Sequence, residues 1–380
     1  MRNVGTRFSP LDLELQILPN QRLTPRMEML AIDFGGEVSF GRAAQKMRLH
    51  HGVTLSKECV RQRTQRAGAA YVAVQAEATP ETPLSQEPVG ERMMLSVDAA
   101  KIHTTTGEWR DAKTLTIAEV DEDGETHSNS YFTRVAEHTE FARQAQVETC
   151  RRQIAKSTAV CAVNDGAEWI PPVIDALRPD AERILDFYHG AEHLAEDGRA
   201  ALGEGTPAFQ AWFDDARHDL RHGTPDDTLV RLADLGAEHP EAIETINRDQ
   251  AYFTKRLDMI RYVEFKAANW PIGSGPGEAA HKIVVQVRMK GAGMRWHADN
   301  VNSMLAIRNL LCNNRWESDW RRIVAYRLGL PQNPPQPPRP TPKLLPQGFE
   351  LRRPPAWTNQ PVGMARLRPF PAAPADREKS

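Results

Sequence analysis

Three acidic residues stand where carboxylates could act together on a substrate. Asp98 ends a short apolar segment, LSVD, and Asp165 ends a second one, VCAVND. Glu278 lies in the first turn of a helix that begins in the glycine-rich segment GSGPG. Carboxylates at strand ends gather at one rim of a sheet, which is where α/β folds bind their ligands. We therefore expect Asp98, Asp165 and Glu278 to form one site.

Carboxylate oxygens are hard ligands that suit Mg²⁺ or Mn²⁺. Two such ions about 4 Å apart could stabilise the attacking and leaving oxygens of an in-line displacement at phosphorus. Each acid also has a structural interpretation, because aspartates at strand ends commonly cap turns or helices. Glu278 could close a capping box with Gly275 as the N-cap. The order and contexts of the three residues together favour the catalytic interpretation.

The segments around these acids predict a mixed α/β sheet. Strand-like stretches cover MMLSVDAAKI, TLTIAEV and SYFTRV, and a turn at 121–124 separates the last two. A helix over 137–156, the strand STAVCAVND, the short helix PPVIDALRP and the strand ERILDF follow. Three strands, a helix and then strand–helix alternation are typical of such a sheet. The stretch 190–262 is helical in period throughout, which predicts an inserted all-helical subdomain.

Residues 24–70 predict short helices. Ser39 caps FGRAAQKMRLHHG, and Ser56 caps a helix that is expected to end at Gly68. Two capped helices joined by the short turn at 52–55 resemble a helix-turn-helix, whose second helix enters the major groove of DNA. Any small helical bundle with a basic surface would give the same pattern. Basic residues of the second helix are the expected DNA contacts: Lys57, Arg61 and Arg63.

The distribution of charge favours a polyanionic partner, although the net charge is only -2. Residues 1–70 carry eleven Lys/Arg against six Asp/Glu, and residues 282–327 carry nine against three, whereas the middle is acidic. Such a chain can bind a polyanion at near-zero total charge, although ordinary solvated faces would give similar counts. Four basic residues after Glu278 are expected to contact DNA phosphates: Lys282, Arg288, Lys290 and Arg295.

His189 and His193 belong to the segment HGAEH, which matches the H-x-x-E-H motif of one class of zinc peptidases. Their spacing puts both imidazoles on one helix face, but a zinc peptidase also needs a third ligand and an enclosing helical domain. The preceding strand places the motif at a sheet edge instead. We therefore expect the two histidines to be neighbours of the acidic site, with simple helix packing as the alternative.

Four sequence blocks closely resemble the signature segments of bacterial insertion-sequence transposases of the ISKra group: SVDAAKI, AVNDGAEWI, DFYHGAEHL and IGSGPGEAAHKIVVQVRMKGAGMRW. The resemblance runs from about residue 8 to 326 and includes FSPLDLEL and LTPRMEML. These proteins are Mutator-like DDE transposases with a ribonuclease H-like fold. The resemblance implies that Asp98, Asp165 and Glu278 are the metal-binding triad, with the helical insertion between its second and third members.

The resemblance further implies an enzyme that cleaves and joins DNA strands with two Mg²⁺ or Mn²⁺ ions. Its partners would be double-stranded DNA, as transposon terminal repeats and target, and other copies of the chain bound there. In Mutator-like enzymes a histidine near the position of His189 lies beside the active site, where it could position DNA or water.

The sequence departs from the family pattern in two ways. Relatives carry a cysteine zinc ribbon upstream of FSPLDLEL, whereas only MRNVGTR precedes it here, and Ala99 stands where relatives often have glycine. The first departure predicts a truncated copy or a mis-started reading frame that recognises transposon ends weakly. A non-catalytic DNA-binding relative is thus the alternative function, and a zinc peptidase is the third.

Composition excludes several other classes of protein. A chain of 380 residues that is 40% hydrophobic and 26% charged is neither disordered throughout nor collagen-like. No apolar run approaches the ~20 residues of a membrane span, and the N-terminus lacks the apolar core of a secretory signal. The four cysteines include no C-x-x-C pair, which is typical of a reducing compartment. These features predict a cytoplasmic protein, and the resemblance to insertion-sequence transposases further implies a bacterial protein associated with the nucleoid.

The expected organisation follows the changes in composition along the chain. Half of the 28 prolines lie in the last fifty residues, which predicts a disordered tail. The expected segments are a helix-turn-helix region at 1–70, a linker at 71–90, the ribonuclease H-like core at 91–189 and 263–330, the helical insertion at 190–262, and the proline-rich tail at 331–380.

Overall fold

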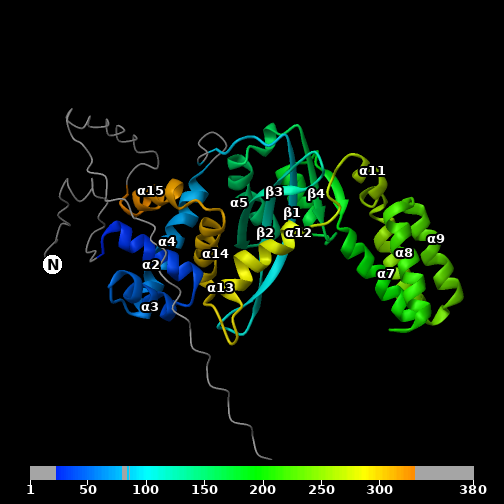
Figure 1. Ribbon diagram of the computed structural model, residues 1–380, viewed down its shortest axis with the longest axis horizontal. Coiled ribbons are helices and arrows are strands. Elements are labelled where there is room, and N and C mark those ends of the chain that lie inside the picture. Colours follow the sequence, from blue (N-terminus) through cyan, green and yellow to red (C-terminus); the bar gives the residue numbers. More distant parts are fainter. Residues whose placement is uncertain (1–22, 79–83, 85, 330–380) are drawn as a thin grey trace, which may run out of the picture. The chain divides into compact units, whose positions relative to one another are not determined.

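The computed structural model describes residues 23–78, 84 and 86–329, and its centre is a five-stranded mixed sheet (Figure 1). The strand order is β3-β2-β1-β4-β5. The strands are β1 (Arg92–His103), β2 (Trp109–Val120), β3 (Thr126–Val135), β4 (Ala159–Asn164) and β5 (Glu182–Leu185). N-terminal helices precede this sheet and many helices follow its strands, so the predicted mixed α/β class is confirmed. The predicted 331–380 tail and the FSPLDLEL segment lie outside the described residues.

The direction of each strand follows from the connection before it. β1, β2 and β3 are antiparallel, and the predicted turn at 121–124 joins the last two. There Asp121 Oδ1 accepts the backbone N–H groups of Asp123 and Glu125, and Gly124 takes a positive φ of 81°. β4 and β5 run parallel to β1, so they require crossover helices. These are α5 (His138–Arg151), which is shorter than predicted, and α6 (Ile170–Leu177).

Alternation along β1 divides the core between the two faces of the sheet. Leu95 and Val97 face a core that includes side chains of α5 and α6. Met94 belongs to a separate core formed with the inserted helices. Ser96 and Asp98 have the same parity as Met94, so they lie on the face opposite to α5 and α6.

The N-terminal helices begin where the capping residues predict. They are α2 (Pro25–Glu37), α3 (Phe40–His51) and α4 (Lys57–Glu77), and the hydroxyls of Ser39 and Ser56 accept first-turn N–H groups of α3 and α4. The predicted end of α4 at Gly68 is wrong, because the helix continues to Glu77. A Cβ at Gly68 would lie 2.0 Å from the carbonyl oxygen of Ser303, so this glycine permits close packing on α14.

The predicted linker therefore begins too early. Residues 71–77 are helical, and Tyr71 and Val74 are buried in the main core. Residues 79–83 and 85 of that linker lie outside the described residues. The N-terminal helices share this core with the sheet, so in the described ranges residues 24–70 pack as part of the same unit as the α/β region.

Helices fill the stretch 190–262, as the sequence predicts, and extend beyond it on both sides, and further helices follow. The insertion comprises α7 (Phe187–Leu202), α8 (Pro207–His222), α9 (Pro225–Glu238), α10 (Ile243–Thr254) and α11 (Tyr262–Ala267). After it come α12 (Gly275–Ala280), the π-helical turn η4 (His281–Gln286), α13 (Val287–Met289), α14 (Ala298–Cys312) and α15 (Trp316–Arg327). No helix between residues 23 and 78 or between 86 and 329 has the length and hydrophobicity needed to cross a membrane.

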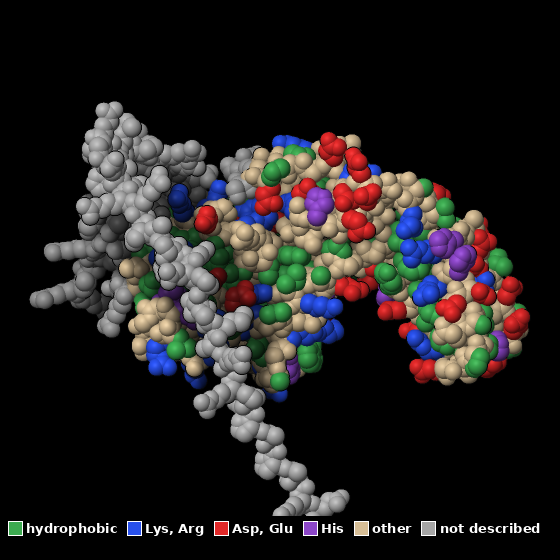
Figure 2. Space-filling view, viewed as in Figure 1, with side chains coloured by type: hydrophobic (Ala, Val, Ile, Leu, Met, Phe, Trp, Pro, Cys, Tyr) green, Lys and Arg blue, Asp and Glu red, His purple; other side chains and the backbone are tan. Residues whose placement is uncertain are grey.

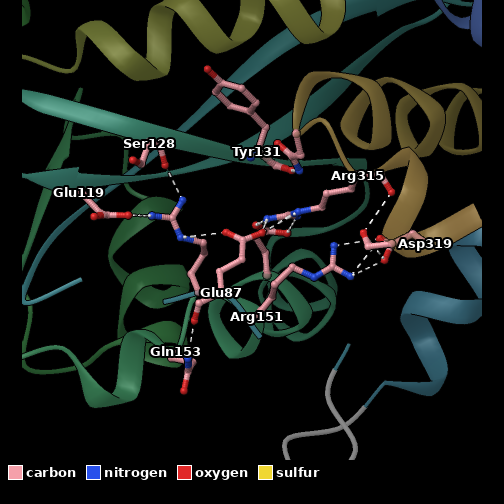
Figure 3. Close-up of polar contacts among 12 residues, drawn as sticks. Glu87, Glu119, Ser128, Tyr131, Arg151, Gln153, Arg315 and Asp319 are labelled. Atoms are coloured by element: carbon pink, nitrogen blue, oxygen red, sulfur yellow. Dashed lines mark hydrogen bonds and ion pairs between the residues drawn. The ribbon is translucent and has the colours of Figure 1, made fainter. Parts of the chain in front are cut away.

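A network of buried ion pairs connects α15 and the residue before it to α5 (Figure 3). Arg151 and Asp319 are both almost fully buried and pair at 2.9 Å. Arg315 reaches Glu148 at 2.7 Å and also pairs with Glu87. A buried charge is tolerated only when it is paired and hydrogen-bonded, so each arginine here needs its carboxylate.

Replacing Asp319 by alanine should destabilise the protein strongly. The change leaves the guanidinium of Arg151 buried without its partner, which typically costs about 3–5 kcal/mol. Urea unfolding of wild type and Asp319→Ala measures this difference. Glu140→Ala is the matched control, because its exposed pair with Arg143 is worth about 0–1 kcal/mol. Equal free energies of unfolding for the two variants would contradict the assigned role of Asp319.

Candidate active site

Three neighbouring strands carry an aspartate at the same edge of the sheet. The β1–β4 ladder ends with Leu95 beside Ala162, and three residues further along lie Asp98 and Asp165. The β4–β5 ladder ends with Asn164 beside Leu185, so Asp165 and Asp186 follow as neighbours. β1 has an antiparallel neighbour on one side and a parallel neighbour on the other. The strand order β3-β2-β1-β4-β5 also reverses between β1 and β4, and such a reversal is where open α/β sheets form their ligand crevice.

Asn164 bridges the two central strands where their backbone ladder stops. Its buried Oδ1 accepts the backbone N–H of Val97 at 2.6 Å, and its carbonyl accepts the N–H of Asp186 at 2.7 Å. Beyond the last backbone pair of β1 and β4, the Asn164 side chain thus supplies a hydrogen bond between the two strands. This contact fixes the spacing between Asp98 and Asp165. The prediction that Asp98 ends its strand is wrong, because β1 continues to His103 through its pairing with β2.

Asp98 is held from two sides. One carboxylate oxygen accepts the backbone N–H of Ala99 at 2.6 Å, and the other lies 3.1 Å from Nδ1 of His281. The Asp98 side chain is 38% exposed, so its carboxylate remains accessible, whereas the histidine is buried. His281 lies three residues after Glu278, which brings the face of that helix to Asp98.

The helix that carries Glu278 packs directly on β1. A Cβ at Gly277 would lie 2.5 Å from Oγ of Ser96, so only glycine allows this approach. Glu278 itself is exposed, and its carboxylate has no hydrogen bond or ion pair with the described residues. The N-cap is Ser274 instead of Gly275, without a side-chain capping bond. The capping-box interpretation of Glu278 is therefore wrong.

A π-helical turn follows Glu278 immediately. η4 begins at His281, and the guanidinium of Arg308 on α14 donates to the carbonyl oxygens of Ile283 and Val284 within it. These bonds stabilise a turn that is rare in helices and often marks functional sites. The turn sets the orientation of the residues that follow Glu278.

The loop after β4 is fixed by the helical insertion. Tyr252 on α10 donates its hydroxyl hydrogen to the carbonyl oxygen of Asp165 at 2.8 Å, and Arg256 donates to the carbonyl of Gly166 at 2.6 Å. Gly166 has a φ of +78°, and a Cβ there would lie 2.6 Å from the Tyr252 hydroxyl. Both the conformation and the space require glycine. Asp165 Oδ1 accepts the N–H of Ala167, which closes the turn.

Asp186 is a positioning residue that the sequence argument missed. It is buried, and Oδ1 accepts the first N–H groups of α7 from Tyr188 and His189. Its Oδ2 accepts the N–H of Ser274 in the loop that leads to Glu278. This one carboxylate therefore ties the insertion to the Glu278 loop. The signal was present as an aspartate directly after the strand ERIL.

The three predicted acids thus reach one edge of the sheet, from β1, the loop after β4 and α12. In the described part of the chain, however, no three His, Cys, Asp or Glu side chains lie close enough to hold a metal ion. The carboxylates of Asp98, Asp165 and Glu278 are accordingly near-neighbours by backbone position and not an assembled cluster. Their chemistry, accessible oxygen donors from three elements, nevertheless fits a hard divalent cation.

The two histidines of HGAEH have different surroundings. His193 points to the interior of the insertion, with Nδ1 3.1 Å from Asp249 and its ring stacked on Tyr252 at 4.1 Å. His189 is more exposed and faces Glu192 at 3.5 Å. Across the described ranges the motif does not belong to any group of three metal-binding side chains. His193 packs against Tyr252, which in turn contacts the Asp165 loop.

Some of the predicted DNA-binding residues are exposed, and others form ion pairs within the protein. Lys57, Lys282, Lys290 and Arg295 are exposed. Arg61 pairs with Glu58 within α4 at the surface, whereas Arg63 pairs with buried Glu28 at 3.1 Å and so joins α4 to α2.

Arg288 does not lie on the surface, where a residue that contacts DNA must lie. It is buried, donates to the carbonyl oxygen of Gly35 at 3.0 Å, and lies between the rings of Phe40 and Trp296. Burial lowers the pKa of Arg288 to about 10. The residue joins α13 to α2, and in this position it does not reach a phosphate.

Asp197 and Asp249 form a buried acidic pair behind His193. Arg248 donates to both oxygens of Asp249, whereas neither oxygen of Asp197 has a hydrogen-bond partner among the described residues. Burial and the charge of Asp249 raise the pKa of Asp197 to about 8, so its carboxyl group is protonated at pH 7. Its ordinary value is near 3.9. The folded state therefore binds the extra proton between pH 4 and pH 8, and stability falls as pH rises through that window.

Asp197→Asn should remove this pH dependence, because asparagine has the same shape and cannot ionise. Relative to wild type, the variant should gain little at pH 4 and on the order of 2–4 kcal/mol at pH 8. Urea unfolding at the two pH values measures the change. Asp249→Asn is the control and should lose stability, since His193 and Arg248 would lose their partner. A gain for Asp197→Asn that is equal at both pH values would contradict the assignment.

This part of the sheet presents accessible carboxylates on elements that contacts from elsewhere in the fold hold in place. Its supports come from the insertion, through Tyr252 and Arg256, and from α14, through Arg308. No family model matches the sequence, and no curated protein matches it.

Proposed function

We propose that this chain is a DDE-type transposase with a ribonuclease H-like core. One observation carries the proposal: Asp98 and Asp165 lie three residues past the end of the β1–β4 ladder, and the Glu278 helix packs on β1 beside Asp98. The strand order 3-2-1-4-5 is consistent with that fold. The sequence blocks that resemble ISKra-group transposases include all three acids.

The proposed cofactor is a pair of Mg²⁺ or Mn²⁺ ions held by Asp98, Asp165 and Glu278. When bound, such ions supply Lewis acidity for an in-line displacement at phosphorus. Side chains of the protein position the carboxylates. His281 orients the carboxylate of Asp98, and Tyr252 and Arg256 fix the loop of Asp165.

Two displacements would follow one another at this site. Water first attacks a phosphodiester at the transposon end, and the bond to the 3′ oxygen breaks to leave a free 3′-hydroxyl. That hydroxyl then attacks a phosphodiester of target DNA, displacing the target's 3′ oxygen. Neither step needs a covalent bond between protein and DNA. Exposed basic residues after Glu278 would hold the DNA backbone across the site: Lys282, Lys290 and Arg295.

The cellular setting follows from the substrate. Terminal repeats and target are double-stranded DNA, so the enzyme would work at the nucleoid in the bacterial cytoplasm. Paired ends imply two or more copies of the chain on the DNA. The N-terminal helices α2–α4, with Lys57 exposed on α4, would contribute end binding.

Asp98→Asn, Asp165→Asn and Glu278→Gln should each abolish strand cleavage and leave DNA binding nearly intact. Each change removes a carboxylate charge and keeps the size of the side chain. The assay follows nicking of a labelled duplex that carries the terminal repeat of the flanking element, with Mg²⁺, with Mn²⁺ and with EDTA. Glu122→Gln in the β2–β3 turn is the matched control and should cleave normally.

Either of two outcomes would count against the proposal. Normal cleavage by any one of the three variants would remove that residue from the triad. Tight duplex binding by wild type without nicking under any metal would instead favour a non-catalytic DNA-binding protein.

Lys282→Ala combined with Lys290→Ala should weaken duplex binding through electrostatics alone. Each lost phosphate contact lowers the slope of log K against log salt by about 0.9, so the double variant should lose nearly 2. Fluorescence anisotropy over a salt series measures the slope. Lys266→Ala, an exposed lysine of α11, is the control. An unchanged slope for the double variant would show that DNA does not contact this helix.

A further inference from the structure

A groove between α7 and α8 has no part in the chemistry proposed above. Its volume is about 920 Å³. We call it the α7–α8 groove; the side chains that matter here are aromatic and basic, namely Phe187, Tyr188, Arg199, Phe213, Arg217 and Arg221. Basic and histidine side chains gather over α8 in the space-filling view (Figure 2). His218 and His222 also line the groove.

The arginines of the groove are held against aromatic rings. The guanidinium of Arg221 lies over Phe187 at 5.5 Å, and that of Arg217 lies over Phe213 at 5.8 Å. Stacking fixes the plane of a guanidinium and leaves its N–H groups free to bind oxygen. Arg221 has no carboxylate partner in the part of the chain that the structure describes. These features are typical of phosphate recognition.

The acidic residues of the groove are already engaged. Asp214 accepts from Gln210 at 3.0 Å and lies 3.6 Å from Arg217. Glu192 lies 3.5 Å from Nδ1 of His189. Three arginines (Arg199, Arg217 and Arg221) line the groove against the two carboxylates of Glu192 and Asp214, so the lining keeps a net positive charge.

Tyr188 connects the groove to the candidate active site. Its side chain is 65% exposed, which is unusual for a large aromatic residue. A Cβ at Gly273 would lie 3.3 Å from its ring, so the tyrosine packs against the loop that leads to Glu278. An exposed ring can stack on an unpaired base, whereas the bases of a duplex already stack on one another.

We propose that the α7–α8 groove binds an unpaired DNA strand, with phosphates on Arg199, Arg217 and Arg221 and a base on Tyr188. The inference rests on the proposed function, because a strand that leaves the Glu278 loop would pass Tyr188 into the groove. The substrate class is thereby narrowed to DNA that is locally single-stranded beside the cleavage point.

The test measures binding of a fluorescein-labelled 15-nucleotide oligo-dT to the full chain in EDTA, by anisotropy. Arg217→Gln with Arg221→Gln should weaken binding at least tenfold and lower the salt slope by about 1.4, since each single-strand phosphate contact contributes about 0.7. Tyr188→Ala should weaken binding about tenfold, and Tyr188→Phe should restore it because the ring still stacks. Arg143→Gln on α5 is the matched control, and unchanged thermal melting shows that each variant folds.

A second measurement locates the strand directly. Oligo-dT carrying one 5-iododeoxyuridine should crosslink to Tyr188 on irradiation, as read by mass spectrometry of the peptides. Crosslinking elsewhere, equal loss of binding in Arg143→Gln, or tighter binding of oligo-U RNA than of DNA would overturn the proposal.

Failure of this proposal and failure of the transposase assignment have different signatures. Binding in EDTA needs no chemistry, so oligo-dT binding at the groove by a chain that never nicks DNA would contradict only the catalytic assignment. Normal metal-dependent nicking by a chain whose oligo-dT binding does not respond to Tyr188 or the arginines would contradict only the groove.

Discussion

The hydrogen bonds and contacts that hold the aspartates of three neighbouring strands are the interactions on which the site depends. Asp98 lies within β1, three residues past the end of its pairing with β4, whereas Asp165 and Asp186 directly follow β4 and β5. Each carboxylate has a donor from another element or from its own turn. His281 faces Asp98, the N–H of Ala167 serves Asp165, and Asp186 takes the first amides of α7. The fold supplies these donors before any substrate arrives.

The helical insertion supplies several of these contacts. Its helices begin at Asp186, and its far helix α10 returns to hold the Asp165–Gly166 loop through Tyr252 and Arg256. Behind Tyr252 stands His193, which is held by Asp249. The insertion thus contacts the chain directly after β4 and after β5. In the sequence it lies between these two strands and Glu278.

Local features of the fold could be predicted from the sequence, and features set by distant packing could not. Capping by Ser39 and Ser56 depends on neighbouring amides, so those helix starts were predictable. Gly68 looked like a helix end, but its lack of a side chain serves a contact with Ser303, far away in the chain. The contacts of Tyr252 with the Asp165 loop join residues 87 apart, and no spacing rule indicates them.

Basic residues show most clearly why a charge count is a weak guide to a binding surface. The surplus in residues 282–327 suggested a DNA-binding face, yet Arg288, Arg308 and Arg315 are buried. Arg308 and Arg315 satisfy backbone carbonyls and carboxylates, and Arg288 joins two helices. A guanidinium can do this because it is planar, carries five donors and is more weakly hydrated than an ammonium group. Lys282, Lys290, Arg295 and Arg321 of the same stretch remain exposed. Only part of the basic residues that a charge count includes is therefore available to a partner at the surface.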